Sequence, residues 1–80
     1  MPNYKQHLLE KYGDTIRKKA AKPRITLGGL IDSVFKEGTV KEKTKSEIRD
    51  AILVMTGEGS LIIEAISQKR LEVNLPSKGT

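Results

Sequence analysis

The sequence predicts a small α+β protein in which three helices are followed by a C-terminal β-hairpin. Apolar residues recur at three- to four-residue spacing in three separate stretches, and each stretch has a helix-capping residue before it. Near the C-terminus the spacing changes to two, because Leu71, Val73 and Leu75 alternate with polar residues. The alternative is an all-α protein with four helices. Both predictions place the whole chain in one domain.

The first 24 residues predict a basic N-terminal helix or arm. Asn3 is a suitable N-cap, and Pro23 ends the segment. Gly13 interrupts the pattern and Asp14 offers a second cap, so the segment forms either one helix with a weak point or two short ones. The apolar positions that share one face are Tyr4, Leu8, Leu9, Tyr12, Ile16 and Ala20.

The second stretch predicts a short helix with one buried face. Thr26 is its N-cap, and Gly38 stands where a C-terminal glycine is expected. Its apolar residues fall at the positions of a single helical stripe, and we expect all of them, Phe35 included, to be buried. The stripe consists of Leu27, Leu30, Ile31, Val34 and Phe35.

The third stretch predicts a helix from about Lys45 to Met55. Thr44 and Glu47 have the spacing of a capping box, in which each side chain bonds the backbone N–H of the other residue. Ile48, Ala51, Ile52 and Met55 then continue with helical spacing.

The residues after Gly59 favour a hairpin over a fourth helix at residues 60–69. Leu61, Ile63 and Ala65 form one side of the first strand with Ile62 and Ile66 opposite, and we expect burial on both sides near its start. The turn is expected at residues 67–70. In a variant of this fold, residues 52–55 pair with residues 61–64 across the turn at 56–60.

The length of 80 residues fits one small domain, 1–80, with a loose tail at 77–80 after Pro76. Ile, Leu, Val and Phe account for 21 positions, 8 + 8 + 4 + 1, which is enough for a folded chain with a thin core. A core this small is helped by dimerisation, and we therefore expect a homodimer as one partner.

The composition disfavours most enzyme and metal chemistry. The chain has no Cys and one His, His7, so thiol catalysis, cysteine-ligated zinc and a catalytic triad lack their parts. We expect no enzyme activity, no cofactor and no metal. No apolar run reaches the roughly 18 residues of a membrane span, and the polar N-terminus does not resemble a signal peptide. The expected compartment is the cytoplasm.

The charge of +5 is concentrated at the N-terminus. Residues 1–24 carry seven basic and two acidic groups, 7 − 2 = +5, whereas residues 25–80 carry eight of each, 8 − 8 = 0. Residues 17–24 hold five cations and no acid. Such a concentration attracts polyanions, most often nucleic acid, although cations in a last helical turn also stabilise the helix dipole.

The third helix carries a second group of polar and basic residues. Lys41 and Lys43 precede it, and its N-terminal half would present Lys45, Ser46 and Arg49 to solvent. Lys, Ser and Arg on an exposed half-helix are typical of a major-groove recognition helix. Neighbouring acids dilute this charge, so an ordinary amphipathic helix remains the alternative.

Residues 26–75 resemble a winged-helix DNA-binding domain. The resemblance rests on the succession LGGLIDSVFKEG, KSEIRDAILVM and LIIEAISQKRLEV, in which the last stretch corresponds to the two-stranded wing. It implies that Lys45, Ser46 and Arg49 reach base edges and that Lys69 and Arg70 touch the backbone or the minor groove. It also implies that residues 17–24 bind phosphates, with Arg24 entering a minor groove.

The sequence therefore predicts a DNA-binding protein, a transcriptional or replication regulator that acts on double-stranded DNA. The alternative is a protein–protein interaction module (an adaptor, inhibitor or assembly component) that binds an acidic partner through a basic and apolar surface. The candidate nucleic-acid-binding residues are Arg17, Lys18, Lys19, Lys22, Arg24, Lys41, Lys43, Lys45, Ser46, Arg49, Lys69 and Arg70.

Overall fold

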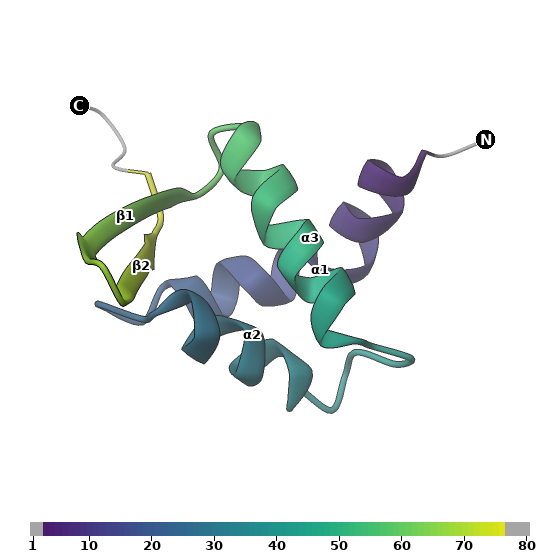
Figure 1. Ribbon diagram of the computed structural model, residues 1–80. Coiled ribbons are helices and arrows are strands. Elements are labelled where there is room, and N and C mark those ends of the chain that lie inside the picture. The colour runs from purple at the N-terminus through teal and green to yellow at the C-terminus, as the bar shows by residue number, and fades with distance from the viewer. Residues whose placement is uncertain (1–2, 77–80) are drawn as a thin grey trace.

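The computed structural model describes residues 3–76 and confirms the α+β fold class. Three helices pack around one core, and a two-stranded hairpin extends from one side of them (Figure 1). The tail predicted at 77–80 lies outside the described residues. The elements are α1 (Tyr4–Ala20), α2 (Leu27–Phe35), α3 (Lys45–Gly57), β1 (Ile62–Ser67) and β2 (Arg70–Asn74).

Helix α1 is a single helix, which settles the choice between one helix and two. The Asn3 side chain accepts a hydrogen bond from the Gln6 N–H at 2.8 Å and caps it. Gly13 lies on the buried side without ending the helix, and the Asp14 side chain is fully exposed. Tyr12 and Ile16, on either side of Gly13, are buried in the core, and their packing stabilises the helical conformation at the glycine.

Helices α2 and α3 begin at the predicted caps but end elsewhere. Thr26 accepts from the Gly29 N–H at 3.0 Å, and Thr44 accepts from the Glu47 N–H at 3.1 Å. Helix α2 stops at Phe35, so Gly38 is not its terminal glycine, and α3 runs two residues beyond Met55.

The chain turns sharply after α3 and forms the hairpin. Gly59 has φ +85°, a conformation that favours glycine, and the Ser60 N–H donates to the Met55 carbonyl at 2.9 Å. β1 and β2 are antiparallel, with Ser67 opposite Arg70. The two loop residues, 68–69, thus lie inside the turn predicted at 67–70. The fourth-helix alternative and the strand pairing of residues 52–55 are both wrong, since 62–67 is a strand and 52–55 is helical.

The segment between α1 and α2 pairs with the hairpin along β2. Thr26 forms a β-bridge with Glu72, and the Val73 N–H donates to the Ile25 carbonyl at 2.9 Å. β2 therefore lies between β1 and this segment. Within residues 3–76, β1 pairs only with β2, and its other edge is open.

The core lies between the three helices and the base of the hairpin. It contains the buried part of each helix's apolar stripe. The predicted stripe of α2 is not wholly buried, since Phe35 is 37% exposed and Leu27 and Ile31 are only partly buried against the core. The largest fully buried side chains are Tyr12, Leu8, Ile16, Leu30, Ile48, Ile52, Met55, Leu61, Val34 and Val73.

The hairpin is less buried than its sequence predicts. Ile62 and Ile66 are 47% and 46% exposed, so β1 is not buried on both sides. Leu71 is 40% exposed although it alternates with buried Val73, and Glu72 is 6% exposed. The strands extend beyond the helices, so only the residues at their base meet the core.

Candidate nucleic-acid interface

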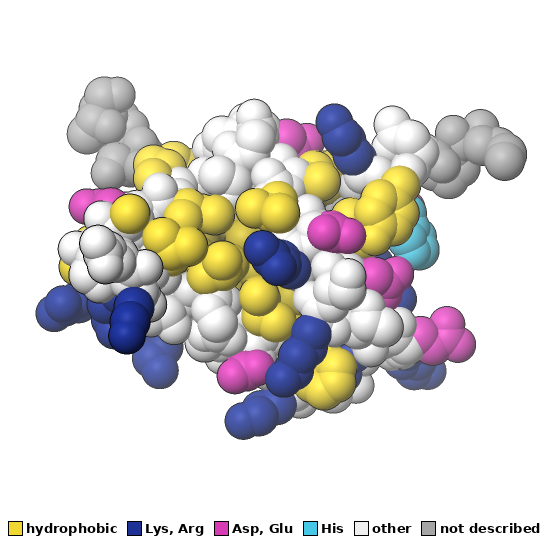
Figure 2. Space-filling view, in the orientation of Figure 1, with side chains coloured by type: hydrophobic (Ala, Val, Ile, Leu, Met, Phe, Trp, Pro, Cys, Tyr) yellow, Lys and Arg dark blue, Asp and Glu magenta, His cyan; other side chains and the backbone are white. Residues whose placement is uncertain are grey.

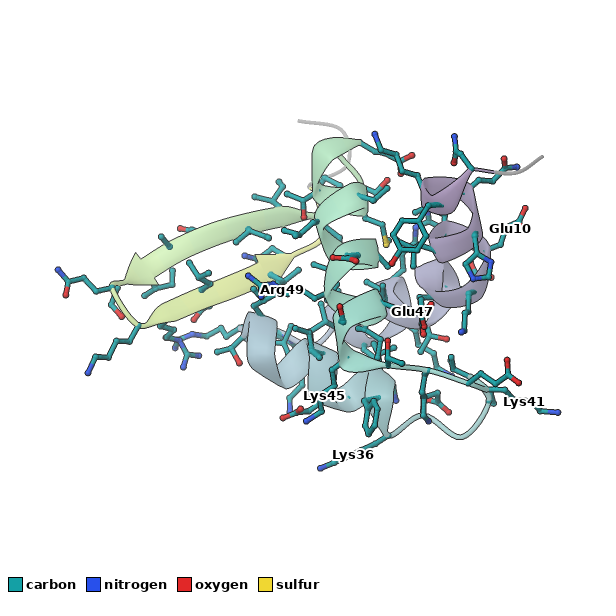
Figure 3. All side chains as sticks on the ribbon, turned by 45° about the vertical axis from the view of Figure 1, so that its right-hand side comes forward. Glu10, Lys36, Lys41, Lys45, Glu47 and Arg49 are labelled. Carbon is teal, nitrogen blue, oxygen red and sulfur yellow. The ribbon has the colours of Figure 1, made fainter. Side chains whose placement is uncertain are left out.

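The exposed side of α3 carries the residues predicted to contact DNA bases. Ile48, Ile52 and Met55 point into the core, so residues on the opposite side of the helix face solvent. Ser46 and Arg49 are exposed there. Figure 3 shows Arg49 pointing from α3 toward the hairpin. The structure thus brings Arg49 and the hairpin to one side of the molecule.

The two lysines nearest the start of α3 are held by α2 and the residues that follow it. The Lys45 ammonium lies 3.2 Å from the Asp32 carboxylate and 5.4 Å from the Phe35 ring centre. The Lys43 ammonium donates to the Glu37 carbonyl and lies 5.9 Å from the same ring. The exposed ring of Phe35 therefore receives two cations. Both side chains remain accessible at the surface, because Lys45 is exposed and Lys43 is only partly buried.

A junction between α1 and α3 fixes the first turn of α3. The Tyr12 hydroxyl donates to the Glu47 carboxylate at 2.9 Å and accepts from the Thr44 N–H at 3.3 Å. This hydroxyl takes the backbone N–H that Glu47 was predicted to bind, so the capping box is completed through Tyr12. Lys11 adds an ion pair to Glu47 at 3.4 Å.

The contacts in this junction shift the pKa values of its members. The hydrogen bond from Tyr12, with help from Lys11, lowers the pKa of Glu47 despite partial burial. Burial is the largest cause of the raised pKa of Tyr12, and the hydrogen bond to Glu47 raises it further. Burial alone would lower the pKa of Lys11, but its contacts with Glu47 and Tyr12 outweigh that effect and raise it. All three shifts favour a carboxylate, a neutral phenol and an ammonium at neutral pH.

A second cluster lies at the far end of the hairpin. The buried Glu72 carboxylate accepts from Arg70 at 2.8 Å and lies 3.7 Å from Arg24. Arg70 also donates to the Arg24 carbonyl at 3.2 Å. Arg24 has φ +61°, an uncommon conformation for a side-chain-bearing residue, which turns the chain back toward β2. Together with Lys69 in the turn, the cluster has three cations and one anion.

A shallow hollow of about 400 Å³ lies between this cluster and the start of α2. Lys69, Arg70 and Leu71 line it on the hairpin side, and Thr26 to Gly28 line it on the helix side. The exposed cations of the hairpin thus lie beside the N-terminus of α2, where the helix dipole adds to the positive potential.

The basic end of α1 faces a different direction. The buried stripe of α1 packs on α3 and α2. Arg17 is exposed outside that stripe, and Lys18 borders a hollow that Glu37 and Thr39, after α2, also line. Arg17 lies 3.7 Å from Asp14, and Lys19 lies 3.0 Å from Glu37. Lys22 is exposed beyond the end of the helix. Of the predicted segment 17–24, only Arg24 contacts the hairpin.

Lys41 is also separate from the α3 surface. It lies in the connection between α2 and α3, and Figure 3 shows it pointing away from Arg49. The predicted site is therefore divided into four groups: the α3 surface with Arg49, the hairpin end with Lys69 and Arg70, the basic end of α1, and Lys41 in the α2–α3 connection.

Sequence reasoning missed the two residues that organise these groups, Tyr12 and Glu72. Tyr12 fits the apolar stripe of α1, and no local pattern connects its hydroxyl with Thr44, which is 32 residues further along the chain. Glu72 has no local signal either, because its burial depends on a bridge to Thr26 from a distant part of the chain.

No group of three or more His, Cys, Asp or Glu side chains within residues 3–76 is arranged to hold a metal ion. In the same part of the chain no helix has both the length and the apolar character for crossing a membrane. Comparison with protein-family models, curated proteins and solved structures finds no match to this chain.

Proposed function

We propose that the protein binds double-stranded DNA in the cytoplasm through α3 and the hairpin, as a non-enzymatic regulator. The main support is the exposed N-terminal half of α3, where Ser46 and Arg49 face solvent and Arg49 points toward the hairpin (Figure 3). The element order and the bridge between the α1–α2 segment and β2 agree with a winged-helix arrangement. That arrangement places a helix in the major groove and a hairpin against the adjoining backbone.

Each group has a distinct part in this proposal. Arg49 reads base edges, because a guanidinium forms paired hydrogen bonds with guanine in the major groove. Lys69 and Arg70 bind phosphates and fix the register of the protein, but they carry no sequence information. Glu72 holds Arg24 and Arg70 in place and reduces the charge of the hairpin end by one.

The basic end of α1 has a different function in this proposal. Arg17 and Lys18 lie on α1 rather than on α3 or the hairpin, so we assign them no direct contact with the duplex that α3 contacts. Their charge still raises the local potential and speeds the encounter with a polyanion. The predicted arm of residues 17–24 thus contributes long-range attraction, and direct phosphate contact is limited to its last residues.

Fluorescence anisotropy with a mixed-sequence duplex at two salt concentrations tests the proposal. On a preferred site selected from a pool of random duplexes, we expect Arg49→Ala to weaken binding by about 5- to 150-fold, the range for one base-reading side chain. Arg17→Ala is the matched control, since it removes the same charge from α1, and we expect a small, salt-sensitive effect. Equal losses in the two variants would contradict the assigned surface.

A second candidate function is a protein–protein interaction module. The exposed apolar side chains favour it, because seven large hydrophobic residues of residues 3–76 are at least 37% exposed. On the face shown in Figure 2, hydrophobic side chains gather over the hairpin and α3. Absence of DNA binding at about 50 mM salt, where even non-specific phosphate contacts are measurable, would favour this second function.

A further inference from the structure

The side chain of Phe35, at the C-terminal end of α2, lies among lysines from two segments. Its ring is 37% exposed instead of joining the core. The Lys45 ammonium lies 5.4 Å from the ring centre, and the Lys43 ammonium lies 5.9 Å from it. Lys36 follows Phe35 directly in the sequence and is exposed. The ring attracts ammonium groups through its electron-rich face, so these four residues form one group, the Phe35 cluster.

The positive charge of the Phe35 cluster exceeds the negative charge beside it. The Asp32 carboxylate pairs with Lys45 at 3.2 Å. Lys43 donates to the backbone carbonyl of Glu37, whereas the Glu37 carboxylate pairs with Lys19 at 3.0 Å. Three lysines and one carboxylate give 3 − 1 = +2. An ammonium has three N–H donors, so Lys43 and Lys45 keep donors for an anion.

The Phe35 cluster is continuous with the proposed DNA surface of α3. Lys45 and Arg49 are four residues apart and therefore lie on the same side of α3, one turn from each other. Figure 3 shows Lys36 and Lys45 at the same end of α2, whereas Lys41 points away from both. A duplex that contacts Arg49 therefore passes close to the cluster.

The length of α2 separates two cationic groups by a distance that suits DNA. The hairpin end lies at the start of this helix, because Lys69 and Arg70 line a hollow with its first residues. The Phe35 cluster lies at its other end. α2 has 9 residues, and a rise of about 1.5 Å per residue makes it about 13 Å long. The major groove of B-DNA is about 12 Å wide, so the two groups are spaced to contact the phosphates on its two sides.

We propose that the Phe35 cluster binds phosphates of the DNA strand opposite the one that the hairpin contacts, and that Phe35 positions its lysines. This inference rests on the proposed function. It assigns Lys45 to a phosphate, whereas the winged-helix resemblance implies a base edge. The ion pair with Asp32 draws the Lys45 ammonium toward α2, which leaves Arg49 to read bases. An ammonium binds a phosphate as a point charge and carries no sequence information.

Lys43 and Lys41 form a matched pair for the test, because both precede α3 in the same connection and only Lys43 lies over the Phe35 ring. Fluorescence anisotropy at several salt concentrations gives the affinity and its salt dependence. Lys43→Gln should weaken binding to a selected and to a mixed-sequence duplex by the same factor. It should also lower the slope of log affinity against log salt by about 1, the loss of one phosphate contact. Lys41→Gln removes the same charge outside the cluster and should leave the slope unchanged.

A double-mutant cycle tests the positioning role of Phe35. Phe35→Leu keeps the net charge and an apolar side chain but removes the ring. It should weaken duplex binding by about 2- to 5-fold, the range for one exposed cation–π interaction. With Lys43→Gln and Lys45→Gln already present, the same change should have little further effect, because the ring then has no ammonium to position. A purely structural role would give equal losses in both backgrounds. Circular dichroism confirms that each variant is folded.

The outcomes separate this inference from the proposed function. The same change of slope in Lys43→Gln and Lys41→Gln, or equal losses from Phe35→Leu in both backgrounds, would overturn the inference. Duplex binding that depends on Arg49 but not on Lys43 would also overturn it and would leave the proposed function intact. If the unmodified protein binds no duplex at about 50 mM salt, both are wrong.

Discussion

The α1–α3 junction and the hairpin differ in how completely their side chains are buried and hydrogen-bonded. At the junction Tyr12 is fully buried, and its hydroxyl has a donor and an acceptor within hydrogen-bond distance. In β1, two isoleucines remain nearly half exposed. The junction is thus complete within one chain, whereas β1 keeps exposed apolar side chains, as do α1 at Tyr4 and α3 at Leu53.

The difference arises from where each region meets the core. The helices contribute most of the buried residues, but the hairpin contributes mainly Val73, with Leu61 just before β1. A two-stranded hairpin alone is marginally stable, and this one is held by its base and by the bridge to Thr26. The four predictions that follow test this difference, beginning with the largest expected effect.

Matched isoleucine truncations should separate the two regions most clearly. Ile52→Ala removes a fully buried side chain and should lower the free energy of unfolding by about 2–5 kcal/mol. Ile66→Ala removes an exposed one and should change it by at most about 0.5 kcal/mol in the monomer. Urea denaturation at low protein concentration measures both. Similar losses at the two sites would mean that the hairpin is part of the cooperative core.

The two tyrosines that bond α3 carboxylates give a second test. Tyr12→Phe leaves the Thr44 N–H and the Glu47 carboxylate without this hydroxyl, and we expect a loss of about 1–3 kcal/mol. Tyr4 bonds Asp50 at 3.0 Å on the exposed surface, where water can replace the lost group. Tyr4→Phe should therefore have a much smaller effect, and the same denaturation measurement compares the two.

Acid should weaken the junction through Glu47. Its pKa is lower in the folded protein than its ordinary value near 4.5, so its contribution is complete above that ordinary value. The contribution is lost as the pH falls through the lowered folded value. Stability curves from pH 7 to 3 should show this decline, and Glu47→Gln should flatten it. A slope that Glu47→Gln leaves unchanged would assign the acid sensitivity to another group, such as Glu37, whose pKa Lys19 lowers.

The smallest effect concerns the glycine inside α1. A Cβ atom added at Gly13 would meet nothing within 4 Å, and glycine is about 1 kcal/mol less favourable than alanine in a helix interior. Gly13→Ala should raise the free energy of unfolding by up to that amount. Thermal and urea denaturation measure the change, and a destabilised variant would show that the buried side of α1 has no space for a methyl group.

The local patterns predicted the elements well because each depends on nearby residues. The caps at Thr26 and Thr44 and the spacing of Ile48, Ile52 and Met55 define their helices within one or two turns. The helix ends were less accurate, since Gly38 matches a terminal glycine although α2 has already ended at Phe35.

The candidate site was predicted as a set of residue types but not as an arrangement. The positions of Ser46 and Arg49 on the exposed side of α3 follow from helical spacing alone. The separation of Arg17 and Lys18 from that surface depends on how α1 packs across α3, which no local pattern encodes. The same applies to Lys45, because its ion pair with Asp32 joins two helices.

The sequence by itself determined the three helical stretches, the net charge and its concentration in residues 1–24, and it favoured the hairpin over a fourth helix. Those properties follow from spacing, capping and composition. Only the tertiary structure decided that Glu72 is buried between two arginines, that Tyr12 completes the cap of α3, and that β1 has an open apolar edge. The physical reason is that burial and pairing depend on which distant segments meet, and a strand's alternation does not specify how much of it the core will cover.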